Sequence, residues 1–231
     1  MRVEYIDNNG YVIETEKAVY VFNFVDGLLP GTYFRNNKPL IFFVSNGNRE
    51  YYSEGIYSYK KTVIFSYDIL QEPYQKVFKM YPNEMIHLGF AKVYAYGTTR
   101  EGVVYVVKED DKTFIDAGNL NNWHYQEFST TKRVEMETEN FLSNLMELEG
   151  HSNPDVLIFP VNAEIGYNYD HGAKRAVRIL KPKHFFPTQY ERLSRINEFI
   201  NWTETEENTQ FHFPKYNNQI FEVKDDTSSN I

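Results

Sequence analysis

The chain of 231 residues contains no cysteine and no long apolar run. Without a thiol, it has no disulfide scaffold, no thiolate zinc site and no cysteine nucleophile. No stretch approaches the roughly 18 consecutive apolar residues of a membrane-spanning helix. The first 30 residues also lack the basic start and apolar run of a signal peptide. We therefore expect a cytoplasmic protein that does not enter a membrane.

Positive charge is also scarce, because Lys and Arg total 24 against 32 Asp and Glu, for a formal net charge of -8. Nucleic acids and anionic membranes attract a cationic surface, so neither is an expected partner. The sequence has no Gly-x-Ser-x-Gly, Walker or Gly-x-Gly-x-x-Gly motif. Serine hydrolases, nucleoside triphosphatases and dinucleotide-binding enzymes of the usual kinds are therefore disfavoured.

Apolar residues are plentiful, and their spacing changes along the chain. Hydrophobic residues make up 42% of the sequence and aromatic residues 17%, which is enough for a large core. Strand-like runs dominate the first half, whereas helical spacing appears at 132–149, 173–180 and 193–200. No linker or internal repeat interrupts the pattern. We predict one α/β domain over residues 1–223 and a polar, loosely ordered tail over 224–231.

The predicted strands and turns can be placed more closely. A hairpin turn at 7–10 contains Asn-Gly, which favours the positive φ angles of tight turns. Ser53 is a candidate cap for a short helix that ends near Lys60, and Gly150 is a candidate cap for the helix at 132–149. The predicted strands are 3–6, 11–13, 18–22, 40–44, 62–66, 85–96, 103–108, 113–116, 155–161 and 184–186.

Four segments resemble, in order, motifs of the metallo-β-lactamase superfamily, and more narrowly a group of small bacterial metal-dependent hydrolases. Residues 44–51 stand where that group has Val-Ser-His-x-His-x-Asp-His, and residues 117–124 resemble its Ala-Gly-Asp-Leu-Asn-x-Trp-His. Residues 10–24 resemble the first hairpin of the family, and residues 159–189 resemble its last third. The resemblance therefore extends over residues 1 to about 190.

This resemblance implies a four-layer αβ/βα sandwich, in which two mostly mixed β-sheets are flanked by helices. It also implies a metal site at one edge between the sheets. Relatives use one or two Zn, Fe or Mn ions to lower the pKa of a bound water, which then attacks the substrate.

The sequence departs from the family at almost every metal-ligand position. The positions of the ligands are occupied by Asn46, Asn48, Glu50, Tyr51, Asn119 and Gln189. Asn23 and Asn162 stand at two further acidic positions, and Arg100 replaces an acid at the edge of the site. Amide oxygens are weak, neutral ligands that zinc rarely uses. We therefore expect no metal cofactor and a non-catalytic pseudoenzyme with a binding or structural role.

Two interpretations of the amide cluster remain open. Amides carry donors and acceptors together, so they can form a closed hydrogen-bonded plug. Alternatively, an open pocket lined by amides, Tyr and Trp would suit a small neutral polar ligand. In either case we expect Asn46, Asn48, Asn119 and Gln189 to line one pocket. Glu50, Tyr51 and His124 would then lie at or near its wall.

Two rival functions are also consistent with the sequence. The first is a metal-dependent hydrolase with an atypical metal site around Glu50 and His124. His124 could act there as an acid, a base or a ligand, although a loop histidine that holds backbone groups explains it better. The second rival is an interaction module, such as a homodimer, that uses the aromatic residues near 51–59.

Overall fold

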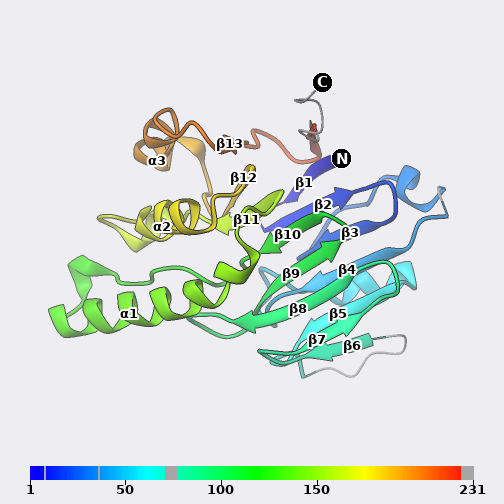
Figure 1. The fold of residues 1–231 in the computed structure, drawn as a ribbon, viewed down its shortest axis with the longest axis horizontal. Coiled ribbons are helices and arrows are strands. Elements are labelled where there is room, and N and C mark those ends of the chain that lie inside the picture. The colour runs from blue at the N-terminus through cyan, green and yellow to red at the C-terminus, as the bar shows by residue number, and fades with distance from the viewer. Residues whose placement is uncertain (8, 36, 71–76, 225–231) are drawn as a thin grey trace.

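Two mixed β-sheets lie face to face in the computed structural model, which describes residues 1–7, 9–35, 37–70 and 77–224 (Figure 1). Each sheet has seven strands within these ranges. The first sheet has the order β14 (Gln219–Glu222), β1 (Arg2–Asp7), β2 (Gly10–Glu14), β3 (Val19–Phe22), β4 (Leu40–Val44), β5 (Thr62–Ser66) and β6 (Val77–Met80). The second has the order β13 (Gln210–Phe211), β12 (His184–Thr188), β11 (Val156–Pro160), β10 (Lys112–Asp116), β9 (Val103–Glu109), β8 (Lys92–Gly97) and β7 (Met85–His87).

Each sheet combines an antiparallel part with a parallel part. Strands β14, β1, β2 and β3 are antiparallel, whereas β3 to β6 are parallel. In the second sheet β7 to β10 are antiparallel, and β10 to β13 are parallel. The parallel strands β4, β11 and β12 are buried along their whole length, which explains their continuous apolar runs. Because parallel strands end at the same edge, the segments after them meet there.

The outer faces of the two sheets are covered differently. In Figure 1, α1 (Thr131–Glu147), α2 (His171–Leu180) and α3 (Asn197–Thr203) lie together along the second sheet. The first sheet is covered instead by two 3₁₀ helices, η1 (Gly31–Phe34) and η2 (Glu54–Tyr59). The remaining 3₁₀ helices are η3 (Gln126–Phe128), η4 (Glu149–His151), η5 (Ala163–Ile165) and η6 (Leu193–Arg195). The predicted sandwich of two mixed sheets flanked by helices is confirmed.

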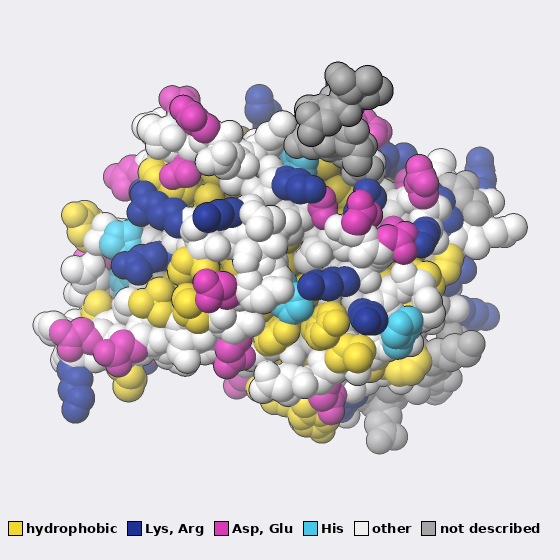
Figure 2. Space-filling model, in the orientation of Figure 1, with side chains coloured by type: hydrophobic (Ala, Val, Ile, Leu, Met, Phe, Trp, Pro, Cys, Tyr) yellow, Lys and Arg dark blue, Asp and Glu magenta, His cyan; other side chains and the backbone are white. Residues whose placement is uncertain are grey.

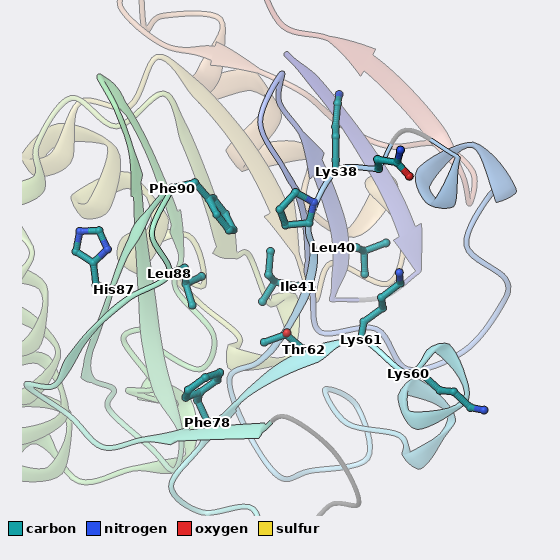
Figure 3. Close-up of a pocket in the computed structure, with 12 residues that line it drawn as sticks. Lys38, Leu40, Ile41, Lys60, Lys61, Thr62, Phe78, His87, Leu88 and Phe90 are labelled. Carbon is teal, nitrogen blue, oxygen red and sulfur yellow. The ribbon is translucent and has the colours of Figure 1, made fainter.

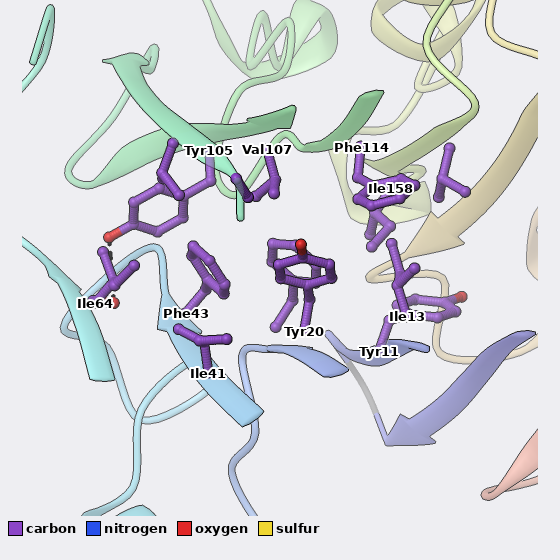
Figure 4. Packing of buried hydrophobic residues seen from close by; sticks show 14 of the residues in the cluster. Tyr11, Ile13, Tyr20, Ile41, Phe43, Ile64, Tyr105, Val107, Phe114 and Ile158 are labelled. Carbon is purple, nitrogen blue, oxygen red and sulfur yellow. Dashed lines mark hydrogen bonds between the residues drawn. The ribbon is translucent and has the colours of Figure 1, made fainter. Parts of the chain in front are cut away.

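Aromatic side chains fill the space between the sheets (Figure 4). Tyr20 packs against Phe43 and Phe114, with ring centroids 6.2 and 5.7 Å apart. Buried hydroxyls need partners, and Tyr20 donates a hydrogen bond of 2.6 Å to Glu109 Oε2. Tyr105 likewise donates to the carbonyl oxygens of Val44 and Ile64, at 3.3 and 3.4 Å. These tyrosines therefore join the two sheets through both apolar and polar contacts.

Two local predictions were wrong, and the predicted cap at Ser53 was confirmed. Segment 85–96 is not one strand, because the chain turns at Gly89 (φ +85°) and forms the β7–β8 hairpin. Gly150 does not cap α1. The helix ends earlier, where the Leu148 N–H bonds to the carbonyl oxygens of Leu145 and Met146, and the chain continues into η4. Ser53 does cap a short helix, since its side chain accepts a hydrogen bond from Gly55 N.

Acidic and basic side chains are interspersed over the face of the molecule shown in Figure 2, with hydrophobic side chains between them. In the described part of the chain, no helix is both long enough and apolar enough to span a bilayer. The predicted tail at 224–231 falls almost wholly outside the described residues, as does Asn8 of the predicted hairpin turn.

Candidate functional site

The residues at the metal-ligand positions follow the ends of strands from both sheets. Asn23 follows β3, and Asn46 follows β4 after one residue. In the second sheet, Asn119 follows β10 and Gln189 directly follows β12. These strand ends lie at the same edge of the sandwich, so residues far apart in the sequence are brought together there.

Tyr51 links the amides of the second sheet to the loop that follows β4. Its hydroxyl donates to Asn119 Oδ1 at 2.6 Å and accepts a hydrogen bond from Gln189 Nε2. Gln189 Oε1 in turn accepts from Asn162 Nδ2 at 3.3 Å. Burial raises the pKa of Tyr51 well above its ordinary value, so the phenol stays protonated and can donate a hydrogen bond to Asn119. We call the connected side chains of Asn162, Gln189, Tyr51 and Asn119 the amide chain.

Asn46 is joined to the amide chain through the carbonyl oxygen of Glu101. Asn46 Nδ2 donates to this oxygen at 2.7 Å, and Asn119 Nδ2 approaches it at 3.4 Å. Asn46 Oδ1 accepts from the backbone N–H of Asn48 at 2.7 Å. Asn46 is completely buried, whereas the side chain of Asn48 is exposed. The described hydrogen bonds thus join Asn46, Asn119 and Gln189 into one network, but they include only the backbone of Asn48.

Two polar pockets open on either side of the amide chain. One has a volume of about 580 Å³ and is lined by Asn48 and Asn119 together with Thr99 and Arg100. The other, of about 250 Å³, is lined by Glu50, Asn162 and Gln189. Tyr51 is only 3% exposed, and its hydroxyl is bonded to Asn119 of the first pocket and to Gln189 of the second. The predicted single pocket is therefore two pockets separated by a hydrogen-bonded wall.

A second polar network lies beneath the amide chain and contains a carboxylate that the sequence analysis missed. Asp116, the last residue of β10, accepts a hydrogen bond of 2.9 Å from Asn23 Nδ2. Asn23 Oδ1 accepts from both the backbone N–H and the hydroxyl of Ser45, each at 2.9 Å. Burial raises the pKa of Asp116 to about 7, even though the bonds from Asn23, Gly118 and Ser45 oppose this change.

The backbone at this edge adopts conformations that most residues avoid. Asn23 has φ 49° and Gln189 has φ 58°, and left-handed geometry costs a non-glycine residue about 1–2 kcal/mol. Asn tolerates this region because its short amide can bond locally, but Gln has no such advantage. Gly102 approaches the loop after β4 so closely that a Cβ would lie 2.3 Å from the carbonyl oxygen of Ser45.

His124 and Arg100 are engaged in other contacts. His124 Nδ1 accepts from the backbone N–H of Gln126 at 3.1 Å, and Nε2 lies 3.3 Å from the carbonyl oxygen of Asn168. It therefore holds backbone groups, as the simpler interpretation of a loop histidine predicts. The Arg100 guanidinium lies over the rings of Trp123 and Tyr125, at 5.1 and 5.8 Å from their centroids.

The donors gathered here do not fit a divalent metal ion. The amide oxygens of Asn46, Asn119 and Gln189 each accept a hydrogen bond already, and the phenol of Tyr51 remains protonated. Nowhere in residues 1–7, 9–35, 37–70 and 77–224 do three or more His, Asp, Glu or Cys side chains gather as a metal site would require. Neither catalytic water activation nor Lewis-acid chemistry can be derived from this donor set.

Comparison with known proteins identifies the fold. No protein-family model matches the sequence, and no curated protein matches it. The structure is similar to Igni18, a metallo hydrolase from Ignicoccus hospitalis, with a TM-score of 0.66 and 13% identity over 96% of this chain and 99% of that one. It is also similar to the metallo-β-lactamase fold protein YhfI from Bacillus subtilis, with a TM-score of 0.64 and 11% identity over 95% and 98% of the two chains.

A third similar structure is the isothiocyanate hydrolase from Delia radicum gut bacteria, with a TM-score of 0.57 and 12% identity over 96% of this chain and 99% of that one. The chain therefore has the metallo-β-lactamase fold that the sequence resemblance implied. At these identities the similarity establishes the fold alone.

Proposed function

We propose that this protein is a pseudoenzyme of the metallo-β-lactamase fold, in which a hydrogen-bonded plug has replaced the metal site. The observation that carries the proposal is the amide chain, which runs from Asn162 through Gln189 and Tyr51 to Asn119. By the sequence resemblance, Gln189, Tyr51 and Asn119 stand at metal-ligand positions and Asn162 at a further acidic position, and each forms a hydrogen bond with its neighbour in the amide chain. The plug stabilises the junction of the two sheets and leaves no ligand set for a metal.

The replacements keep polarity while removing charge, which favours a structural role for the network. A buried polar group without a partner costs about 1–3 kcal/mol, whereas a paired one contributes modestly to stability. Five of the eight residues at the ligand and neighbouring acidic positions are linked to one another or to Glu101 O: Asn46, Tyr51, Asn119, Asn162 and Gln189. So many hydrogen bonds among these residues are expected if the network has a structural role. They are not expected if the metal ligands were replaced at random.

The protein retains a binding role in the pocket beside Asn119. This pocket of about 580 Å³ falls within the size range of small-molecule sites. Asn48, Thr98 and Thr99 provide amide and hydroxyl groups, while Arg100 and Glu101 carry opposite charges. A small neutral polar molecule, such as a sugar or an amide, fits this lining better than a strongly charged one.

The proposal is tested by measuring metal content and metal affinity. Protein purified without chelator should contain far less than one equivalent of Zn, Mn or Fe by elemental analysis. Zn²⁺ should bind with a Kd of about 1 mM or weaker, because imidazoles and charge compensation are missing. A chelator should leave the melting temperature unchanged. Near-stoichiometric metal, or a large melting shift on chelation, would overturn the proposal.

A restored site provides the positive control. The combined variant Asn46→His, Asn48→His, Glu50→Asp, Tyr51→His, Asn119→Asp and Gln189→His should gain zinc affinity if the positions correspond to those of the hydrolases. The matched control carries the first three changes alone and lacks the ligands of the second sheet. If the folded six-site variant binds no more zinc than this control, the residues do not occupy metal-ligand positions.

The rival hydrolase with a metal site around Glu50 and His124 has less support. Both ring nitrogens of His124 face backbone groups, and Glu50 lines the pocket on the other side of the amide chain from Asn119.

A further inference from the structure

A larger pocket lies at the opposite edge of the sandwich from the amide chain. It has a volume of about 850 Å³ and is bordered by the first residues of β4 and β5, where Leu40, Ile41 and Thr62 lie. The amide network begins beyond the other end of β4. A five-residue strand rises about 3.3 Å per residue, so the two sites are separated by roughly 15 Å along the strand. The pocket is thus independent of the proposed plug.

The walls of this pocket are apolar and come from both sheets. Figure 3 shows Leu88 and Phe90, from the β7–β8 turn, on one side, with Leu40 and Ile41 opposite them. Phe78 of β6 lies at the lower end of the pocket in this view. Phe78 is 44% exposed although its side chain is aromatic, because nothing among the described residues covers it. An apolar group entering the pocket would therefore remove exposed hydrophobic surface from water.

The charged residues of the pocket are all cationic. Lys38, Lys60 and Lys61 line the side formed by the first sheet, and none of the twelve lining residues is Asp or Glu. This bias stands out in a chain with more acidic than basic residues. Lys38 is already compensated, because its Nζ lies 3.1 Å from Glu14 Oε1 and 2.6 Å from the carbonyl oxygen of Thr15.

Lys60 and Lys61 are different, because neither forms an ion pair with any described residue. Lys61 Nζ lies 5.8 Å from the centroid of the Phe34 ring, a contact that does not neutralise its charge. Lys60 ends η2 with φ 54°, and in Figure 3 its side chain points away from Phe78, Leu88 and Phe90, although its flexible four-carbon stem allows it to turn toward a ligand. Two lysines that line an apolar pocket and have no acidic partner among the described residues are complementary to one chemical class of ligand.

We propose that this pocket binds a small amphipathic anion, with a carboxylate or phosphate head at Lys60 and Lys61 and an apolar tail between Phe78, Leu88 and Phe90. The volume lies within the usual range for small-molecule sites, about 300–1,000 Å³. Lysine acts as a strong point charge for a carboxylate or phosphate, and the apolar walls supply affinity through burial of the tail. Charge sets the orientation of the ligand, and the tail supplies the larger part of the binding.

The test uses the full-length protein and decanoate, kept below its micelle concentration, with calorimetry as the readout. Decanoate should bind with saturation, whereas decanol and inorganic phosphate should each bind at least about tenfold more weakly, because each lacks one half of the recognition. Equal affinity for decanol and decanoate, or no saturation by decanoate at millimolar concentration, would overturn the proposal.

Variants locate the site. The double variant Lys60→Asn and Lys61→Gln should lose about tenfold in decanoate affinity, since each uncompensated charge pair contributes up to about a factor of five. The matched control is Lys181→Asn with Lys132→Gln. Lys181 has φ 51° and ends α2 just as Lys60 ends η2, so both pairs remove the same charge and the same type of cap. The control should change affinity less than twofold, and an equal loss in both would overturn the proposed location.

The apolar wall is tested separately with Phe90→Ala, which should weaken decanoate binding while leaving inorganic phosphate unaffected. Vesicles containing anionic phospholipid distinguish a free ligand from a membrane surface, because the protein should stay in the supernatant after sedimentation. Co-sedimentation that is abolished by Lys60→Asn and Lys61→Gln would overturn the proposal in favour of a lipid surface.

Discussion

Polar side chains at the two ends of β4 and β5 differ in whether they have a partner within the protein. At the carboxyl end of β4, Asn46 is fully buried and both ends of its amide have backbone partners. At the amino end of β5, Lys60 and Lys61 approach a pocket of about 850 Å³ without an acidic partner among the described residues. We call the first edge closed, because its buried amides are hydrogen-bonded within the protein although two polar pockets flank them, and the second edge open, because Lys60 and Lys61 have no such partner in the described part of the chain.

This difference separates polar groups that stabilise the fold from polar groups that remain free to bind. A buried amide must be satisfied within the protein, because leaving it unpaired costs about 1–3 kcal/mol. An ammonium at the rim of a pocket remains hydrated and costs the fold almost nothing. Substitutions at the closed edge should therefore change stability, and substitutions at the open edge should change affinity.

The largest effect is expected at Gly102, which supports the closed edge. In Gly102→Ala the new Cβ would lie 2.3 Å from the carbonyl oxygen of Ser45, at φ +105°. Overpacking and left-handed strain together should destabilise the protein by about 4 kcal/mol, measured by urea unfolding. Gly27→Ala is the matched control, because Gly27 has φ +95° but nothing within 4 Å of its Cβ position. Equal losses in the two variants would show that the close contact with the loop after β4 is unimportant.

The next effect comes from Asp116 and depends on pH. Its pKa is raised from 3.8 to about 7 by burial, so between these values the folded state binds a proton that the unfolded state has released. Stability should therefore fall as the pH rises from about 4 to 7, and the full loss should persist above pH 7. Asp116→Asn cannot ionise, so its advantage over the wild type should grow from near zero at pH 4 to about 3 kcal/mol at pH 8.

Two histidines change the stability with pH in the opposite direction to Asp116, so their contribution must be controlled. Burial lowers the pKa of His151 and of His212 to about 4, so both favour folding above pH 6.5 and lose this contribution as the pH falls toward 4. They are present in both the wild type and Asp116→Asn, so the difference between the two curves isolates Asp116. Asp111→Asn, at an exposed turn, is the matched control for the Asp-to-Asn substitution itself. A pH-independent difference for Asp116→Asn would contradict the raised pKa.

Tyr51→Phe should have the third effect, because it keeps the ring and removes only the central link of the amide chain. Asn119 Oδ1 would lose its donor and Gln189 Nε2 its acceptor, so we expect a loss of about 2 kcal/mol in urea unfolding. Tyr94→Phe is the control, since the Tyr94 hydroxyl makes no hydrogen bond with a described residue and its removal should cost less than about 0.5 kcal/mol. A loss of similar size in both variants would mean that the amide chain contributes nothing to stability.

Much of the closed edge could be predicted from the sequence, because both the ends of its strands and the polar residues that follow them can be recognised in the sequence. Asn46, Asn119 and Gln189 each follow a recognisable apolar strand, and polar residues after parallel strands meet at one edge. Tyr51 was expected at or near the wall of the pocket, but its place between Asn119 and Gln189 could not be deduced, because Tyr51 lies in a loop whose path depends on tertiary contacts. The sequence therefore indicated which residues follow the strand ends at this edge, but not that Asn119 and Gln189 line two different pockets with Tyr51 bonded to both.

The burial of Asp116 and the pocket at the open edge could not be predicted from the sequence. Asp116 is the last residue of β10, where a carboxylate is usually expected to be exposed, and only the structure reveals that it is buried and bonded to Asn23. The cationic pocket combines residues from β4, β5, β6 and the β7–β8 turn, and none of its lysines forms a recognisable motif. Such a site depends on which edges of two sheets face each other, and local spacing does not encode that.

The smallest effect should distinguish the lysines of the open edge from one another. Lys38→Met removes an ion pair with Glu14 and a hydrogen bond to Thr15 O, so we expect a loss of about 0.5–1 kcal/mol, most of it at low salt. Lys61→Met removes a charge without an ion-pair partner and should change stability by less than about 0.3 kcal/mol. Thermal unfolding at low and high salt measures both. If Lys61→Met cost as much as Lys38→Met, the Lys61 ammonium would already be engaged within the folded protein and could not be reserved for a ligand. A stability unaffected by Lys61→Met, together with weaker decanoate binding, is the combination that a binding residue requires.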